Sequence, residues 1–398
     1  MFESTLNPPK TRLDWQLLLA LLVLMLVGGA FICSAKSGLD PVHWHQHFFV
    51  RQILWYLVGM AAAAAICLVD YRILARWAVI GYWLMMILLV AVLIPGIGAR
   101  RMGATRWIDL GIFQLQPSEF AKLAFLCLQA HLLSRPADEL RSPLLFLKSI
   151  GLTLLPFVLI LKEPDLGSAL VFLPVALIMM FVAGVPSRYL VRLLLGLGAV
   201  VTLLLVDILF APPSWQIRLE DYQRRRLLVY FGRDFAADAK TEAEQRKARI
   251  EQRNHSYNVQ QALISVGSGR LWGKGWRQGD QIALGYLPRA VSHNDFIFSV
   301  IAEEKGFLGS LVVISLYAVV LFCGIRIAGE ARDRLGKLLA VGVVALLFTH
   351  VFVNIGMNIR MMPVTGIPLP LLSYGGSSVL GSLLAAGILQ NVHLYHRS

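Results

Sequence analysis

The sequence predicts an all-α polytopic membrane protein with ten transmembrane helices and a large extracytoplasmic loop between helices 7 and 8. Of its 398 residues, 57% are hydrophobic and only 15% are charged, and the mean hydropathy is +0.65. A soluble domain does not bury that much apolar surface, because a single core stops growing well below this length. The apolar residues also fall in runs long enough to cross the roughly 30 Å hydrocarbon core of a bilayer.

Ten apolar segments follow one another, and residues 1–398 are interpreted as one transmembrane domain. The eighth segment is long and contains Lys305-Gly306, which predicts a bend or a break there. An even number of segments places both termini on one side of the membrane. The segments cover residues 14–35, 49–69, 74–95, 116–134, 145–161, 168–184, 187–209, 294–325, 337–358 and 372–394.

Basic residues predict the orientation. The tails and short loops on the side of the termini carry more Lys and Arg than the short loops opposite, which places both termini in the cytoplasm. The net charge is nevertheless +13, and the outer connections 96–115, 162–167 and 359–371 are basic. This favours an anionic ligand at the outer face. The sequence contains no basic motif interleaved with aromatic residues, so it gives no indication of a nucleic-acid partner.

The predicted outer loop, residues 210–293, has two parts. Residues 236–253 are a charged helical run, which indicates a helix that is exposed to solvent or binds a partner. Residues 256–294 are rich in Gly and aromatic residues and show little helical periodicity. The second part predicts backbone that approaches another segment closely.

Asp295 belongs to the stretch 287–306, which places carboxylates and a lysine at the mouth of an apolar helix. Charged groups at membrane depth are rarely tolerated without a function or a partner. A carboxylate that caps the helix start is one interpretation. The other is a general base at the membrane surface. Ser299 and Glu303 follow at four and eight residues, so a polar stripe runs along this helix.

Glu119 and Lys122 lie three residues apart in an apolar segment, and therefore on one helix face. A structural ion pair and a substrate path through the membrane both fit this spacing. Glu163 and Asp165 flank Pro164 in a very short outer connection. They could hold a divalent cation, Mg or Mn, beside a phosphate ligand, or Asp165 could cap the following helix.

Several arginines are candidates for binding phosphate, because a guanidinium group donates two parallel hydrogen bonds. They are Arg100, Arg101 and Arg106 before the fourth segment, and Arg224 and Arg226 in the outer loop. Interfacial anchoring and a solvated face are the alternatives. In the ninth segment, polar residues recur at four-residue spacing and predict hydrogen bonds between helices: His350, Asn354 and Asn358.

Seven motifs in order along nearly the whole chain resemble the SEDS family (shape, elongation, division, sporulation). The last of them, with its IPLP sequence, is more similar to the elongation branch of the family than to the division branch. The motifs are RWIDLG (106–111), QPSEFAK (116–122), EPDLGSAL (163–170), DYQRRR (221–226), GSGRLWGKGW (267–276), NDFIFSVIAEEKGFLG (294–309) and MPVTGIPLPLLSYGGSS (362–378).

The resemblance implies ten transmembrane helices and polymerisation of lipid II into glycan strands on the outer side of the bacterial cytoplasmic membrane. It implies that Asp295 is catalytic and that Glu119, Lys122 and Asp165 belong to a functional cavity. The partners it implies are a class B penicillin-binding protein, which supplies the transpeptidase, and other membrane proteins of the elongation complex.

The chain departs from the family pattern at three places. Arg360 stands where a glycine is usual before MPVTG, and Arg270 replaces the second glycine commonly seen in GSGGL. The charged run 236–253 is longer than the usual loop.

The expected reaction is the attack of a sugar hydroxyl on an anomeric carbon, with undecaprenyl pyrophosphate as the leaving group. In this hypothesis Asp295 takes the proton and Glu119 orients Lys122. Cationic groups would surround the pyrophosphate: Arg101, Arg106, Lys122, Arg226 and a cation at Glu163 and Asp165. A lipid II transporter and a non-catalytic scaffold for the penicillin-binding protein are the alternatives.

Overall fold

The computed structural model describes residues 13–36, 47–101, 104–109, 111, 114–210, 227–232, 242–287 and 292–395. The long helices are α1 (Trp15–Ala35), α2 (Phe48–Cys67), α4 (Ala78–Leu93), α5 (Pro117–Leu133), α7 (Pro143–Lys162), α8 (Leu166–Ala183), α9 (Ser187–Phe210), α11 (Glu242–Ser268), α13 (Ile297–Glu330), α14 (Arg334–Asn358) and α15 (Gly376–Tyr395). The short helices are α3 (Tyr71–Arg76), α6 (Ala137–Leu140) and α12 (Asp280–Ala283).

The prediction of an all-α membrane protein is confirmed, and each of the ten predicted segments contains one of these helices. Within the described residues, eight helices are long and apolar enough to cross a membrane. Helix α4 is shorter, with 16 residues, and α5 has 17. One element was not predicted: the connection 96–115 contains a small antiparallel sheet of β1 (Gly98–Arg101), β2 (Ala104–Asp109) and β3 (Gln114–Leu115).

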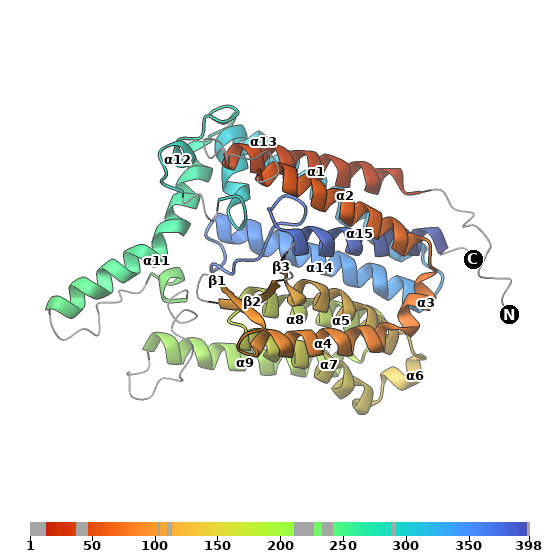
Figure 1. The fold of residues 1–398 in the computed structure, drawn as a ribbon. Helices are drawn as coiled ribbons and strands as arrows, with labels where there is room; N and C mark the ends of the chain where they lie inside the picture. The colour runs from red at the N-terminus through yellow and green to blue at the C-terminus, as the bar shows by residue number, and fades with distance from the viewer. Residues whose placement is uncertain are drawn as a thin grey trace.

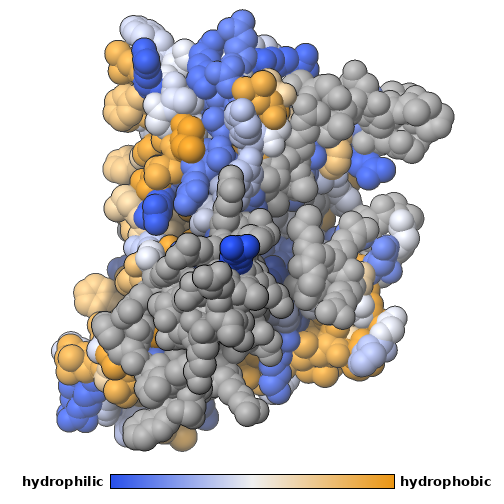
Figure 2. Space-filling view, turned by 90° about the vertical axis from the view of Figure 1, so that its left-hand side faces the viewer, coloured by the Kyte–Doolittle hydropathy of each residue, from blue (hydrophilic) through white to orange (hydrophobic). Residues whose placement is uncertain are grey.

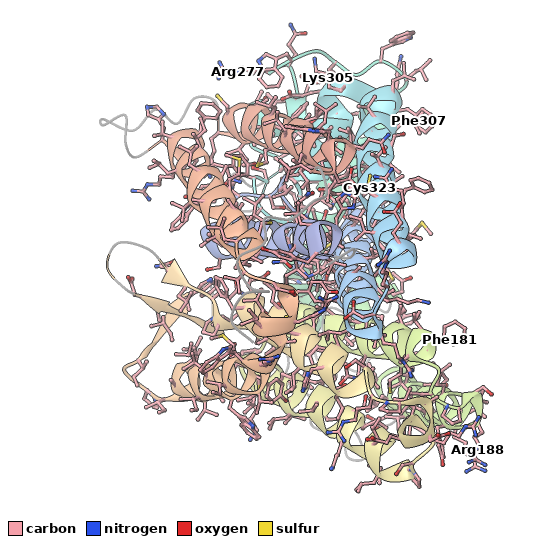
Figure 3. All side chains as sticks on the ribbon, turned by 90° about the vertical axis from the view of Figure 1, so that its right-hand side faces the viewer. Phe181, Arg188, Arg277, Lys305, Phe307 and Cys323 are labelled. Carbon is pink, nitrogen blue, oxygen red and sulfur yellow. The ribbon has the colours of Figure 1, made fainter. Side chains whose placement is uncertain are left out.

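The helices form a bundle whose two ends differ (Figure 1). The sheet, α11 and α12 lie at one end, while α3, α6, the start of α1 and the end of α15 lie at the other. Figure 2 looks onto the first of these ends, and hydrophobic residues line the flank at its left-hand side. Phe181 and Phe307, which are 71% and 60% exposed, project outward from the bundle (Figure 3). Large apolar side chains exposed in this way suit contact with lipid.

The predicted bend in the eighth segment is confirmed at Gly306, where α13 leaves helical geometry with φ 67° and ψ −161°. The loop after α11 satisfies the backbone groups that the kink frees. The amide groups of Phe307 and Leu308 donate to the carbonyl groups of Arg270 and Leu271, at 2.8 and 3.2 Å. Near this kink, Arg277 and Lys305 both lie at the top of the view in Figure 3.

Two carboxylates at the mouth of this helix have structural partners. Glu303 accepts a hydrogen bond from Lys274 at 2.7 Å, and Glu304 accepts one from Ser34 of α1. The backbone amide of Lys274 also donates to the carbonyl of Glu303 at 3.0 Å. Glu303 therefore fixes the loop after α11 against the kink in α13, and Glu304 fixes the end of α1 there.

The prediction that residues 256–294 lack helix is wrong for their first part, because α11 continues to Ser268. The close approach predicted there is confirmed. Gly269 and Gly273 lie so near the backbone of α13 that a Cβ atom at either would overlap a carbonyl group. The charged run 236–253 is helical from residue 242 onward, and its earlier residues lie outside the described part of the chain.

Candidate active site

The polar residues at four-residue spacing in α14 connect three parts of the bundle. His350, Asn354 and Asn358 are all buried, and they share one face of the helix because of their spacing. The prediction that they bond to other segments is confirmed. His350 contacts α5, while Asn354 donates to the carbonyl of Ile367 at 2.7 Å. Both asparagines donate to the backbone carbonyl of Asp295, each at 3.1 Å.

Asp295 lies in the turn immediately before α13 and is half-buried. The N-cap of α13 is the next residue, Phe296, which makes no side-chain cap. Ser299, one turn into the helix, donates a 2.5 Å hydrogen bond to Asn358, which itself holds the Asp295 carbonyl. Asn354 and Asn358 of α14 therefore fix the backbone of Asp295, and the residue as a whole is half-buried.

The segment after α14 lies against the Asp295 carboxylate. Gly366 has φ +75°, and a Cβ atom there would lie 3.6 Å from Oδ2 of Asp295. The neighbouring residue, Thr365, packs on Gly167 in the first turn of α8 so closely that a Cβ atom on Gly167 would overlap its carbonyl oxygen. The start of α8 is thereby brought next to Asp295.

Asp165 is the N-cap of α8, as one of the two interpretations predicted. Its carboxylate accepts hydrogen bonds from the backbone amide of Ser168 at 3.1 Å and from the Ser168 hydroxyl at 2.9 Å. Gln116 donates to the same carboxylate at 3.4 Å. The cap satisfies a free amide group at the helix start. The hydrogen bond from Gln116 links Asp165 to the beginning of α5.

Arg106, in β2, reaches the short connection between α7 and α8. Its Nε atom donates to the carbonyl of Glu163 at 3.4 Å, and one Nη atom donates to the carbonyl of Pro164. The other Nη atom lies 3.9 Å from a carboxylate oxygen of Asp165. The sheet, which the sequence did not predict, therefore places Arg106 at the connection between α7 and α8.

Glu163 is fully buried, and among the described residues neither of its carboxylate oxygens has a hydrogen-bond partner. Burial raises its pKa to about 9, the charge of Asp165 adds to this shift, and Arg106 opposes it. No group of three or more His, Cys, Asp or Glu residues gathers in the described ranges. Two free carboxylate oxygens nevertheless suit Mg²⁺, which proteins often hold with one or two carboxylates while substrate phosphates complete the shell.

The Glu119 and Lys122 side chains form the predicted ion pair. The Nζ atom of Lys122 lies 2.8 Å from a Glu119 carboxylate oxygen and 2.9 Å from Nε2 of His350. The exposed fractions of Glu119 and Lys122 are only 4% and 3%, so water does not screen the pair. The predicted ion pair is therefore present, and its contact with substrate stays a prediction.

Four of the five arginines predicted to bind phosphate have side chains that the structure does not describe. Arg101 is the last residue of β1, and only its backbone is described. Arg226, like Arg224, lies outside the described residues, and the side chain of Arg100 does too.

Sequence reasoning missed Gln116, Ser168 and Gly366. All three stand inside the quoted motifs, and Gln116 and Ser168 lie three positions from the predicted residues Glu119 and Asp165. Ser168 has the spacing of a capping partner for Asp165, and that signal could have identified it. Gly366 offers no side chain, and only its contact with Asp295 reveals its position.

The contacts join the described candidate residues in one network. From Asp295 it runs through Gly366, Thr365 and Gly167 to Asp165, and from Asp165 through Gln116 into α5. From Lys122 it returns through His350 and α14 to Asp295. The fold and site together define a polytopic membrane protein in which a half-buried aspartate, a buried lysine and a partly buried arginine are joined by one set of contacts.

The chain belongs to the FtsW, RodA and SpoVE family, described as a cell cycle protein family, whose model matches residues 14–398. Peptidoglycan glycosyltransferase MrdB of Escherichia coli strain K12 is 35% identical over 390 residues, which cover 98% of this chain and 95% of MrdB.

Two solved structures share the fold over nearly the whole chain. A chain from a peptidoglycan synthase complex, studied for the structural coordination of polymerization and crosslinking, has a TM-score of 0.73 at 30% identity and covers 96% of this chain and 98% of its own. The crystal structure of the rod shape determining protein RodA of Thermus thermophilus has a TM-score of 0.66 at 27% identity, with coverage of 98% and 100%.

Proposed function

We propose that this protein is a peptidoglycan glycosyltransferase that polymerises lipid II into glycan strands during cell elongation, with Asp295 as the general base. The observation that carries the proposal is the position of Asp295. Its backbone is fixed by Asn354 and Asn358, while its carboxylate is half-buried beside Gly366. The name of the relative MrdB supports the same activity.

In the proposed reaction, Asp295 accepts the proton of a sugar hydroxyl as the hydroxyl oxygen attacks the anomeric carbon of a second lipid-linked sugar. The new glycosidic C–O bond forms while the C–O bond to the diphosphate breaks. Undecaprenyl pyrophosphate leaves with the electron pair, and one direct displacement inverts the anomeric carbon. A diphosphate is a good leaving group, so no second carboxylate is required to protonate it.

Cationic side chains of the network would stabilise the charge that develops on the diphosphate. Glu119 and His350 hold two sides of the Lys122 ammonium group, which has three donors, so one remains for a phosphate oxygen. Arg106 lies at the α7–α8 connection. Arg101 and Arg226 are assigned to the same ligand on the chemistry of their guanidinium groups. When bound at Glu163 and Asp165, a divalent cation would neutralise phosphate charge.

The proposed partner is a class B penicillin-binding protein together with other membrane proteins of the elongation complex. The structural match to a chain of a peptidoglycan synthase complex supports the first of these. We further propose that both termini face the cytoplasm of a bacterial inner membrane and that the active site faces outward. The excess of Lys and Arg near the termini supports this orientation.

The experiment that tests the function uses the purified protein and labelled lipid II. In detergent, wild type should form glycan chains, whereas a folded Asp295→Asn variant should form none. In sealed vesicles, transfer of lipid II across the bilayer without polymer would identify a transporter instead. If the protein alone shows neither activity, and polymer appears only when a second polymerase is added, the protein is a scaffold.

A further inference from the structure

A shallow hollow that is open to solvent lies beside the proposed active site and is assigned to none of its parts. It lies between residues 227–232, α11 and the segment after α14. Its lining includes Tyr230, Ser256, Gln260, Arg360, Pro363 and Val364. Arg360 is the one charged residue among the described lining residues, and no acidic side chain is among them.

The backbone at Arg360 is unfavourable for arginine. Helix α14 ends in a Schellman motif. The amide group of Met361 donates to the carbonyl of Gly356 at 2.8 Å, and that of Arg360 donates to the carbonyl of Met357 at 3.2 Å. In this motif the residue in the Arg360 position adopts a left-handed conformation, and here φ is +60°. Glycine fits that conformation without strain, so an arginine there carries strain of the kind that functional sites retain.

The Arg360 guanidinium group is available to a ligand. The residue is exposed, and within the described part of the chain its side chain takes part in no hydrogen bond or ion pair. Tyr230 fixes the adjoining backbone instead, since its hydroxyl donates to the carbonyl of Met361 at 2.9 Å. The hollow therefore combines a fixed wall with an unpaired cation.

The hollow and Asp295 share one short segment. Val364 lines the hollow, and Gly366, two residues further, lies against the Asp295 carboxylate. Two residues span at most about 7 Å. A short peptide carried by the disaccharide whose hydroxyl meets Asp295 can therefore reach the hollow.

We propose that the hollow binds a carboxylate of the peptide carried by lipid II, with Arg360 as its partner. This rests on the proposed function and names a second part of the same substrate that the protein recognises. A single guanidinium group matches a single carboxylate through two parallel hydrogen bonds. A diphosphate carries more charge than one cation balances, and Lys122 and Arg106 together suit it better.

The test compares two substrates: lipid II with its natural peptide, and lipid II with every peptide carboxylate converted to an amide. For wild type, the apparent KM should be about tenfold lower with the natural peptide, the factor expected for one charge-assisted hydrogen bond. Arg360→Gly should remove most of that difference. The variant should fold, because glycine suits the left-handed backbone, and its thermal unfolding is measured alongside. Arg360→Lys should keep part of the difference.

Arg270→Gly is the matched control, because Arg270 also has a left-handed backbone (φ +49°) and lies outside the lining of the hollow. It should leave the substrate difference unchanged. If Arg360→Gly raises KM equally for both substrates, Arg360 serves a different anion, and the proposal is overturned. If wild type makes glycan but does not distinguish the substrates, the proposal also fails. Absence of all glycan from wild type would instead contradict the proposed function.

Discussion

The ammonium group of Lys122 lies 2.9 Å from the Nε2 atom of His350, although the two residues are 228 positions apart in the chain. Because the ammonium group can only donate, Nε2 must be the acceptor, and the imidazole is therefore neutral. With Glu119 on its other side at 2.8 Å, Lys122 is held in one position between α5 and α14. His350 thus acts as a positioning residue for a cation that we assign to the diphosphate.

His350→Leu should lower kcat for glycan formation about tenfold, the effect of losing one hydrogen bond to a charged group. His350→Gln should restore much of the activity, because its amide oxygen can accept the same hydrogen bond. Steady-state polymerisation rates measured beside the thermal unfolding of each variant check this. Equal activity of the two variants, at equal stability, would remove His350 from the mechanism.

The Glu119 and Lys122 pair permits a test that separates stability from catalysis. Lys122→Ala should impair turnover, because the ammonium group assigned to the diphosphate is lost. Lys122→Met should lower the free energy of unfolding by about 3–5 kcal/mol, because either substitution leaves the Glu119 charge buried without its partner. The double variant Glu119→Gln with Lys122→Met removes both charges and should recover most of that stability. It should remain inactive, since no ammonium group is left for the diphosphate.

Thermal unfolding and glycan formation are measured for wild type, both single variants and the double variant. Recovery of polymerisation in the double variant would mean that the pair is structural only. A Lys122→Ala variant whose loss of activity merely follows its loss of folded protein would support the same conclusion.

Gly366→Ala should lower glycan formation, because the added methyl group would occupy space beside the Asp295 carboxylate. The left-handed backbone at Gly366 makes any side chain costly, by about 1–2 kcal/mol, and the new Cβ atom would lie 3.6 Å from Oδ2 of Asp295. Gly184→Ala is the matched control: Gly184 also has a positive φ, +87°, at the end of α8, and no atom lies within 4 Å of its Cβ position. The control should lose similar stability but keep its activity, and equal losses of activity in both variants would show that strain alone is responsible.

The sequence predicts the helices better than it predicts the contacts between them. The segments, the break at Gly306 and the face carrying His350, Asn354 and Asn358 follow from local periodicity and from glycine. Two of the three departures from the family pattern, at Arg270 and Arg360, could be located in the sequence. Their common physical character, a left-handed backbone, required the structure.

Other features depend on packing between distant segments. The contact of Lys122 with His350 requires the rotation of two helices about their axes, which sequence patterns leave undetermined. The strand that carries Arg106, β2, has only six residues and its partner β1 has four, too few for a periodic signal. The sequence predicts too early an end for helix α11. Its last residues, 256–268, stand directly before a run of glycines and aromatic residues, which makes their helical pattern hard to recognise.

Chelation tests the predicted cation at Glu163 and Asp165. If a divalent cation binds there, excess chelator should suppress glycan formation, and added Mg²⁺ or Mn²⁺ should restore it. Glu163→Gln should need a higher cation concentration for half-maximal activity, because an amide oxygen is a weaker ligand than a carboxylate. Full wild-type activity in excess chelator would remove the cation from the scheme.

The pKa of Glu163 predicts a dependence of stability on pH in the presence of chelator. The pKa rises from an ordinary value of 4.5 to about 9 in the folded protein, chiefly because of burial. The folded protein therefore holds the proton more tightly than the unfolded chain does. The resulting stability is fully present below about pH 4.5 and is lost as pH rises through 9, at no more than about 1.4 kcal/mol per pH unit.

Thermal unfolding of the wild type in chelator should accordingly shift to lower temperature between pH 6 and pH 9, whereas Glu163→Gln, which resembles the protonated side chain, should show a flatter profile. Glu139→Gln is the control, because Glu139 is exposed and pairs with Arg135 at the surface, and it should follow the wild type. A Glu163→Gln profile as steep as that of the wild type would mean that Glu163 is already ionised in the folded protein. In that case a positive group must neutralise it, and the search for that group would begin with Arg106, the guanidinium already bonded to its carbonyl.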